Sequence, residues 1–281
     1  MPLAQLTEEQ IEKTIEARQA LEDEEGEQKL SNGTLRRDWA VFRSLLSDAL
    51  RERVIKALPI AGTPRPLEGL NEDPAKRFLG QDDTPEEKAR GTGERARFLT
   101  KLAAFKSDEP GGGDFLRTAC TLSLNTGCRR GEMIAMTDSM IVLNDPGAER
   151  IELPGAITKS GKPRDLFLNV DAIAAIKRWR EVRAALQVQG LKGEMFPAAI
   201  CNWRDRISQR EFPRLCREAG VEGIVFKTLR ATFASLHVQG GTPLREVQKM
   251  LGHASLTTTE RHYAYLEKTA GADRARAFKV S

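Results

Sequence analysis

The stretch LGHASLTTTERHYAYL, residues 251–266, holds both tyrosines of the chain, Tyr263 and Tyr265. The Leu-Gly pair at its start suits the end of one helix, because glycine tolerates the left-handed conformation that ends many helices. A second helix is predicted over 255–266, which places the first tyrosine ten residues after His253. Taken alone, a histidine in such a turn and two tyrosines on a late helix are also typical of packing residues.

Two upstream motifs supply basic side chains. TGCRRGE, residues 126–132, places Arg129 just after a glycine, with Glu132 on the same helical face, where it would orient the guanidinium. KTLR places Lys227 and Arg230 within one helical turn, where both are able to face one anion. Read singly, these motifs also describe a surface ion pair and an ordinary basic turn.

A third basic motif is ITKSGKPR, residues 157–164, which predicts a β-hairpin with Lys159 near its tip. Solvated lysines are also common at hairpin tips, so this motif indicates a functional site only in combination with the other motifs. A tyrosine that meets two arginines, a histidine and lysines suits attack on a phosphodiester without a metal, since the cations take over the charge of a metal.

Charge is spread unevenly over the 281 residues, whose net charge is +4. Residues 1–108 hold 18 Lys and Arg against 21 Asp and Glu, whereas residues 109–281 hold 26 against 19. The C-terminal part is therefore the expected face for a polyanion.

Several protein classes are excluded by composition. No apolar run is long enough for a membrane span, and the first residues, MPLAQLTEEQIEK, do not resemble a secretory signal. The four cysteines form no CxxC pair and are expected to be reduced, mostly buried thiols of a cytoplasmic protein. They are Cys120, Cys128, Cys201 and Cys216.

The fold class predicted from periodicity is mainly α with a small antiparallel β-sheet, in two domains: a helical domain with a linker over 1–97 and an α+β domain over 98–281. Thr7 and Thr34 are the predicted N-caps of the first two helices, and the second helix is expected to carry Leu45 on its apolar face. Helices are expected over 7–29, 35–58, 115–126, 171–187, 203–219, 228–239, 243–251 and 255–266. Strands are expected over 139–143, 149–153 and 165–168.

The four motifs in this order resemble the tyrosine recombinases of the phage integrase family. The resemblance covers roughly residues 98–266 and extends more weakly to TLRRDWAVFRSLLSDAL, which is similar to a helix of the family's N-terminal core-binding domain. It implies a two-domain fold with a catalytic α+β domain. It also implies a site-specific recombinase or integrase that cleaves and rejoins DNA through a 3′-phosphotyrosyl intermediate.

The resemblance assigns a role to each candidate residue. Tyr263 is the implied nucleophile, Arg129 and Arg230 bind the non-bridging phosphate oxygens, and Lys159 protonates the 5′ leaving oxygen. The two residues implied to hydrogen-bond the phosphate are His253 and Lys227. No cofactor and no metal is implied. The implied partners are double-stranded DNA, a homotetramer assembled on it and accessory DNA-bending proteins.

Two departures from the family pattern leave other functions open. Lys227 stands where the family most often has histidine, and a charged lysine cannot accept a proton. The spacing from His253 to Tyr263 is one residue longer than usual, which puts His262 in the common tyrosine position and makes Tyr265 the second candidate. A catalytically impaired, sequence-specific DNA-binding protein and a type IB-like topoisomerase are therefore the alternatives.

Overall fold

The computed structural model describes residues 3–21, 32–68, 77–186, 193–197, 207 and 209–277, with side chains as far as residue 266. The chain forms two compact units, residues 1–74 and 75–281. The division expected after residue 97 would cut α4 (Glu94–Ala104), whose Phe98 is fully buried in the core of the second unit. The observed division lies within the segment 1–97 that was expected to hold the helical domain and its linker.

The first unit is helical, as predicted. Thr7 caps its first helix: its hydroxyl accepts from the backbone N–H of Gln10, whose side chain accepts from the N–H of Thr7. The elements are η1 (Leu3–Gln5), α1 (Glu8–Gln19), α2 (Asn32–Arg51) and η2 (Arg65–Leu67). They enclose a small core of Ile11, Leu35, Trp39, Leu46, Ile55, Ile60 and Leu67.

Helix α2 corrects three details of the prediction. It begins at Asn32, ahead of the expected cap at Thr34, and it ends before Arg53, whose φ of +58° is not helical. Leu45 was expected on the apolar face but is 59% exposed. The residue lies about 100° around the helix from buried Leu46, so it falls at the edge of that face.

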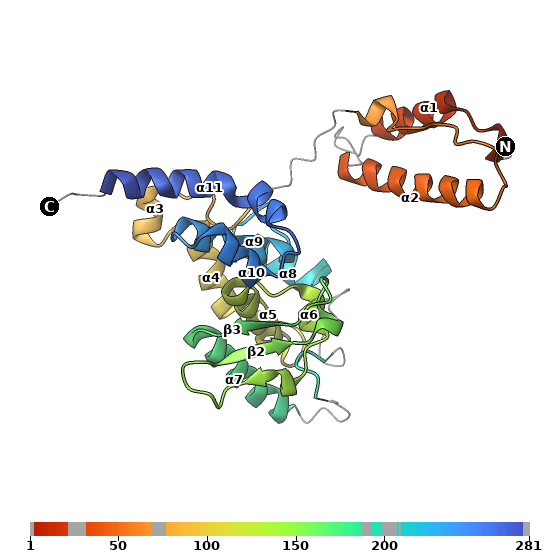
Figure 1. Ribbon diagram of the computed structural model, residues 1–281. Helices are drawn as coiled ribbons and strands as arrows, with labels where there is room; N and C mark the ends of the chain where they lie inside the picture. Colours follow the sequence, from red (N-terminus) through yellow and green to blue (C-terminus); the bar gives the residue numbers. More distant parts are fainter. Residues whose placement is uncertain are drawn as a thin grey trace. The chain divides into compact units, whose positions relative to one another are not determined.

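In the second unit, α5 (Gly112–Thr126) is the central helix. It contacts both α7 (Val170–Ala185) and α9 (Phe226–Gln239), as Figure 1 shows. The remaining described helices are α3 (Pro85–Arg90), α4 (Glu94–Ala104), α6 (Arg130–Ile134), α8 (Phe212–Glu218), α10 (Leu244–Leu251) and α11 (Leu256–Ala277). Helix α8 covers only the end of the segment expected over 203–219, since 203–206 and 208 lie outside the described residues.

A three-stranded antiparallel sheet of order β1-β2-β3 completes the predicted fold class. Leu153 pairs with Arg164 at the end of the hairpin, and Ile151 pairs with Leu166. The inward residues Ile151, Leu153 and Leu166 are buried against the helices, which is the alternation expected of a half-buried sheet. The strands are β1 (Ile141–Val142), β2 (Arg150–Leu153) and β3 (Arg164–Phe167), and two short 3-10 helices flank them, η3 (Asp138–Met140) and η4 (Gly155–Ile157).

A separate apolar cluster joins the last three helices to the start of the unit. Its members are Phe78, Phe233, Ala234, Val238, Leu244, Val247, Leu251, Tyr263 and Leu266. Helix α11 continues through the backbone to Ala277, well past the predicted end at residue 266. Among the residues described, no helix is both long enough and apolar enough to cross a bilayer.

The cysteines within the described ranges are free and buried, as expected of reduced thiols. These are Cys120, Cys128 and Cys216, whereas Cys201 lies outside those ranges.

Candidate active site

Arg129 follows a sharp turn that ends α5. Gly127 adopts a φ of +64° there, and a Cβ at this position would lie 2.6 Å from the ring of Phe233, so glycine is required on both counts. The backbone N–H of Arg129 donates to Glu132 Oε2 at 2.8 Å, and its Nη1 donates to Oε1 at 2.9 Å. The predicted pairing of this arginine with Glu132 is therefore present, and the carboxylate is almost fully buried.

Arg230 enters the site from the first turns of α9. Its side chain is 8% exposed and donates to the carbonyl oxygens of Gly127 and Leu251, the second at 2.5 Å. Burial, followed by the charges of Arg129 and Arg164, lowers the pKa of Arg230 to about 9. The guanidinium stays charged at neutral pH, although its hydrogen-bond partners are carbonyl oxygens rather than a carboxylate.

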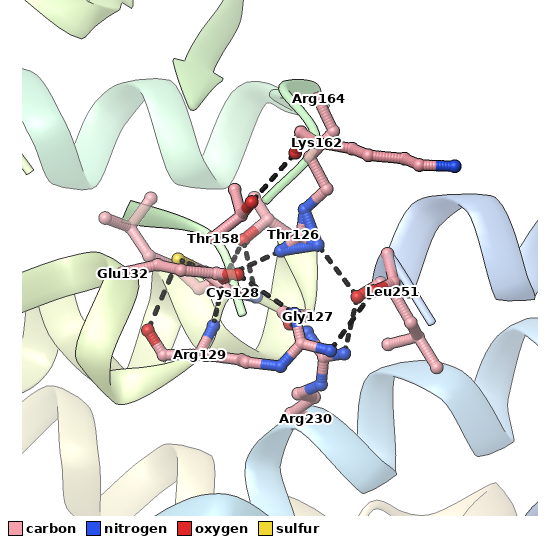
Figure 2. A network of polar contacts seen from close by, with 12 residues as sticks. Thr126, Gly127, Cys128, Arg129, Glu132, Thr158, Lys162, Arg164, Arg230 and Leu251 are labelled. Atoms are coloured by element: carbon pink, nitrogen blue, oxygen red, sulfur yellow. Dashed lines mark hydrogen bonds and ion pairs between the residues drawn. The ribbon is translucent and has the colours of Figure 1, made fainter. Parts of the chain in front are cut away.

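Arg164 is a third arginine of the site, which the sequence pointed to only as a basic neighbour of Lys159. Its Nη2 donates to Glu132 Oε2 at 2.7 Å and its Nη1 donates to the Leu251 carbonyl at 2.7 Å. Figure 2 shows Arg164 and Arg230 meeting at this carbonyl from opposite sides, with Arg129 beside them. The buried Nε of Arg164 has no hydrogen-bond partner.

His253 follows the left-handed C-cap of α10, where Gly252 has a φ of +62°. Its Nδ1 lies 2.9 Å from the hydroxyl of Thr259, a fully buried residue on α11. Burial, followed by Arg230 and Arg129, lowers the pKa of His253 to about 3, so the imidazole is neutral at physiological pH.

The three arginines surround a single carboxylate. Burial raises the pKa of Glu132, but Arg164 and Arg129 outweigh that effect and the pKa is lowered, so the carboxylate is charged. Three guanidinium groups therefore face one negative charge in a half-buried site. Such an excess of positive charge is suited to an anionic ligand.

Tyr263 lies on α11 and is 9% exposed within the apolar cluster that also holds Phe78 and Leu251. Burial raises the pKa of the phenol, and the charge of Arg230 opposes this shift. Tyr265 is 37% exposed, and burial raises its pKa as well. Of the two tyrosines, Tyr263 is thus the one whose ionisation is influenced by Arg230.

The two candidate lysines are exposed. Lys159 occupies the turn between η4 and β3, and Lys227 is the second residue of α9. The structure therefore brings Arg129, Arg230 and His253 together, while both lysines are exposed to solvent. In the described parts of the chain, no group of three or more histidine, cysteine or acidic side chains is placed to hold a metal ion.

Comparison with known proteins identifies the family. Residues 112–269 match the phage integrase family. A tyrosine recombinase XerC of Bifidobacterium longum (strain DJO10A) is 34% identical over 157 residues, which are 52% of this chain and 42% of that protein. The chain thus matches less than half the length of this curated relative.

Two solved structures share the fold at lower identity. The XerH site-specific recombinase bound to palindromic difH substrate superposes with a TM-score of 0.68 at 20% identity, over 97% of this chain and 72% of that one. A lambda integrase dimer bound to a COC′ core site gives a TM-score of 0.59 at 19% identity, over 93% and 81%. Because the family match covers more than half of the residues, this chain belongs to the phage integrase family.

Proposed function

We propose that this protein is a site-specific DNA recombinase that cleaves and rejoins DNA through a 3′-phosphotyrosyl intermediate. The observation that carries the proposal is the charge of the site: within the described ranges, Arg129, Arg164 and Arg230 converge around one carboxylate, that of Glu132. A phosphodiester supplies the missing negative charge. Membership of the family and the DNA-bound state of the two similar solved structures support the same conclusion.

In the proposed reaction, Tyr263 Oη attacks the scissile phosphorus while the bond from phosphorus to the 5′ oxygen breaks. Arg129 and Arg230 bind the non-bridging oxygens and stabilise the charge that builds up in the transition state. Removing one such preorganised donor typically slows a reaction by about two to three orders of magnitude. Lys159 gives its proton to the leaving 5′ oxygen, which departs as a hydroxyl group.

His253 and Lys227 complete the proposed site as hydrogen-bonding partners of the phosphate. His253 is neutral in the free protein, and its Nδ1 is engaged by Thr259, so its Nε2 remains for the ligand. Lys227 is exposed on the first turn of α9 and contributes charge rather than a base. Attack by the 5′-hydroxyl of another strand reverses the first step and joins new partners without ATP.

The proposal extends to the two units and their assembly. The helical unit, residues 1–74, contacts double-stranded DNA as a core-binding domain does, and the larger unit performs catalysis. A homotetramer on two duplexes, helped by accessory DNA-bending proteins, is the proposed working form, with residues 267–281 docking onto a neighbouring protomer. Unchanged assembly on DNA after deletion of 269–281 would remove the docking role.

A covalent-trap experiment tests the chemistry. Purified protein is mixed with a nicked duplex from the DNA flanking its own coding sequence, with EDTA present, and separated on a denaturing gel. Tyr263→Phe and Tyr265→Phe run alongside as a matched pair. We expect a protein–DNA adduct in the wild type and in Tyr265→Phe, and none in Tyr263→Phe.

The same experiment, together with a gel-shift and a plasmid-relaxation assay, separates the alternatives. A normal gel shift without an adduct would indicate a DNA-binding protein without strand transfer, with Lys227 and the long spacing to Tyr263 as the first suspects. Relaxation of supercoiled plasmids of unrelated sequence would indicate a type IB-like topoisomerase. An adduct that moves to Tyr265 would reassign the nucleophile but keep the reaction.

A further inference from the structure

Arg164 links three segments of the candidate site that are far apart in the sequence. It is the first residue of β3 and pairs with Leu153 at the end of the hairpin. From there its guanidinium reaches Glu132 on α6 and the carbonyl of Leu251 at the end of α10, each at 2.7 Å. Figure 2 shows these contacts from close by.

The loop that Arg164 follows has a defined shape of its own. The buried hydroxyl of Thr158 lies 3.1 Å from the Gly155 carbonyl and 2.8 Å from the Lys162 carbonyl. The N–H of Gly161 donates back to the Thr158 carbonyl at 3.1 Å. Lys159 therefore sits on a preformed turn, and where that turn lies relative to the site depends on how the two strand ends below it are held.

The contacts of Arg164 are suited to hold the start of β3 against the site, and the other two arginines keep their own partners without them. Glu132 keeps Arg129 as a partner when Arg164 is removed, and the Leu251 carbonyl keeps Arg230. The backbone at Gly252 packs directly on the guanidinium, since a Cβ there would lie 2.4 Å from Nη1. Loss of Arg164 thus frees the hairpin while the two phosphate-binding arginines stay paired.

We propose that Arg164 is a positioning residue that holds the hairpin so that Lys159 reaches the leaving 5′ oxygen. The inference rests on the proposed function. The bond from Tyr263 Oη to phosphorus forms, the bond from phosphorus to the 5′ oxygen breaks, and one proton passes from Lys159 Nζ to that oxygen. A misplaced hairpin impairs only this proton transfer.

A substrate with a better leaving group isolates that step. When sulfur replaces the bridging 5′ oxygen, the leaving group is a thiolate, whose conjugate acid has a pKa of about 8.5, and it departs without a proton. An alkoxide is a far stronger base than a thiolate, so the 5′ oxygen needs a proton in order to leave. Single-turnover cleavage of matched oxygen and sulfur duplexes therefore reports on proton donation alone.

The experiment compares four variants with the wild type: Arg164→Ala, Arg164→Lys, Lys159→Ala and the control Arg150→Ala. Arg150 is a strand arginine of the same sheet whose partners, Asp145 and Glu152, lie outside the site. General-acid catalysis contributes about 10²–10⁴-fold, so we expect Arg164→Ala and Lys159→Ala to lose about 10²-fold or more on the oxygen substrate. Both should return to about the wild-type rate on the sulfur substrate, and the control should match the wild type on both.

Two outcomes would overturn the inference. If Arg164→Ala is slow on both substrates while Lys159→Ala is rescued by sulfur, Arg164 acts on the phosphate or on the other arginines and not through the lysine. If Arg164→Ala cleaves both substrates at the wild-type rate, it positions nothing needed for cleavage. Should the alanine variant not fold, Arg164→Lys decides the question. This variant keeps the positive charge but loses the two-pronged guanidinium, and its cleavage rates on the oxygen and sulfur substrates are compared in the same way.

The result also separates this inference from the proposed function. Failure of sulfur to rescue Lys159→Ala would withdraw the proton-donor role of that lysine, and the inference with it. Absence of any adduct in the wild type on either substrate would instead remove the phosphotyrosyl chemistry itself.

Discussion

Replacement of Arg230 by methionine tests whether the site stores electrostatic repulsion in the absence of DNA. Methionine keeps much of the volume of the buried side chain but removes its charge and its hydrogen bonds. The wild-type guanidinium is 8% exposed and donates to the Gly127 and Leu251 carbonyls beside Arg129 and Arg164. Its removal therefore has two opposite effects on stability.

The two effects are of similar size. Burial first, and then the charges of Arg129 and Arg164, lower the pKa of Arg230 to about 9, which corresponds to a penalty of about 5 kcal/mol for keeping this charge in the folded protein. Each hydrogen bond from a charged donor contributes about 1.5–3 kcal/mol in the opposite direction. The Leu251 carbonyl keeps Arg164 as a donor, so the variant mainly leaves the Gly127 carbonyl without its partner. We expect the free energy of unfolding to change by less than about 2 kcal/mol.

Activity should respond very differently. Loss of one preorganised phosphate ligand is expected to slow cleavage by about 10²–10³-fold, equivalent to about 3–4 kcal/mol in the barrier. The assays are urea denaturation followed by circular dichroism, and single-turnover cleavage of the nicked duplex. The combination of near-wild-type stability and strongly reduced cleavage is the expected result.

Arg183→Met provides a matched control for stability. Arg183 is half-buried, but its guanidinium pairs with the carboxylate of Asp138 and donates to the Glu194 carbonyl. Removing it should destabilise the fold by about 1–3 kcal/mol, since a charged partner is lost without relief of repulsion. If Arg230→Met were the more destabilising of the two, by more than about 3 kcal/mol, the idea of stored repulsion would be refuted.

Three further changes test other parts of the site. Gly252→Ala should lower the free energy of unfolding by about 1–2 kcal/mol, because φ is +62° and the new Cβ would meet Arg164 Nη1 at 2.4 Å; thermal denaturation measures this. Burial and Arg230 lower the pKa of His253 to about 3, so the unfolded chain binds a proton below pH 6.5 that the folded chain does not. Stability should therefore fall as the pH drops from 6.5 toward 3, by at most about 1.4 kcal/mol per pH unit, and His253→Gln should remove this slope in urea titrations. Phe78→Ala should cost about 3–5 kcal/mol in the same titrations, because the ring is 3% exposed in the tyrosine-containing cluster.

Controls for these changes are available in the same chain. Gly131→Ala introduces a Cβ that meets nothing within 4 Å, so an equal loss in both glycine variants would contradict the steric argument at Gly252. Phe167 is 68% exposed, and Phe167→Ala should leave stability nearly unchanged. Parallel pH slopes in the wild type and in His253→Gln would show that His253 is not the group responsible.

Local features of the site could be read from the sequence because they depend on neighbours along the chain. The pairing of Arg129 with Glu132 follows from their spacing within one helical turn. The helix end at Gly127 follows from the freedom of glycine at positive φ. The hairpin around Lys159 follows from strand patterns on both sides of a turn, which the observed pairing confirms.

Contacts between distant segments were not predictable in this way. Arg164 is 32 residues from Glu132 and 87 from Leu251, and no local period reveals which arginine of a hairpin turns inward. Thr259 is buried against His253 because α11 packs back on α10, whereas its sequence reads as a polar helix start. Phe98 likewise joins the core of the second unit only through tertiary packing.

The positive charge of this site is held largely by the ends of helices. Helix α5 ends at Gly127 and α10 ends at Leu251 and Gly252, and the carbonyls of these residues accept from Arg230, Arg164 and Arg129. The last carbonyls of a helix have no partner within it, and the helix dipole makes that end partly negative. Partial charges of this kind orient the guanidinium groups but leave their positive charge in place. A carboxylate paired with each arginine would instead neutralise that charge. The two glycines that end these helices therefore serve the chemistry as well as the fold, because they place unpaired carbonyls where arginines must stay charged for an incoming phosphate.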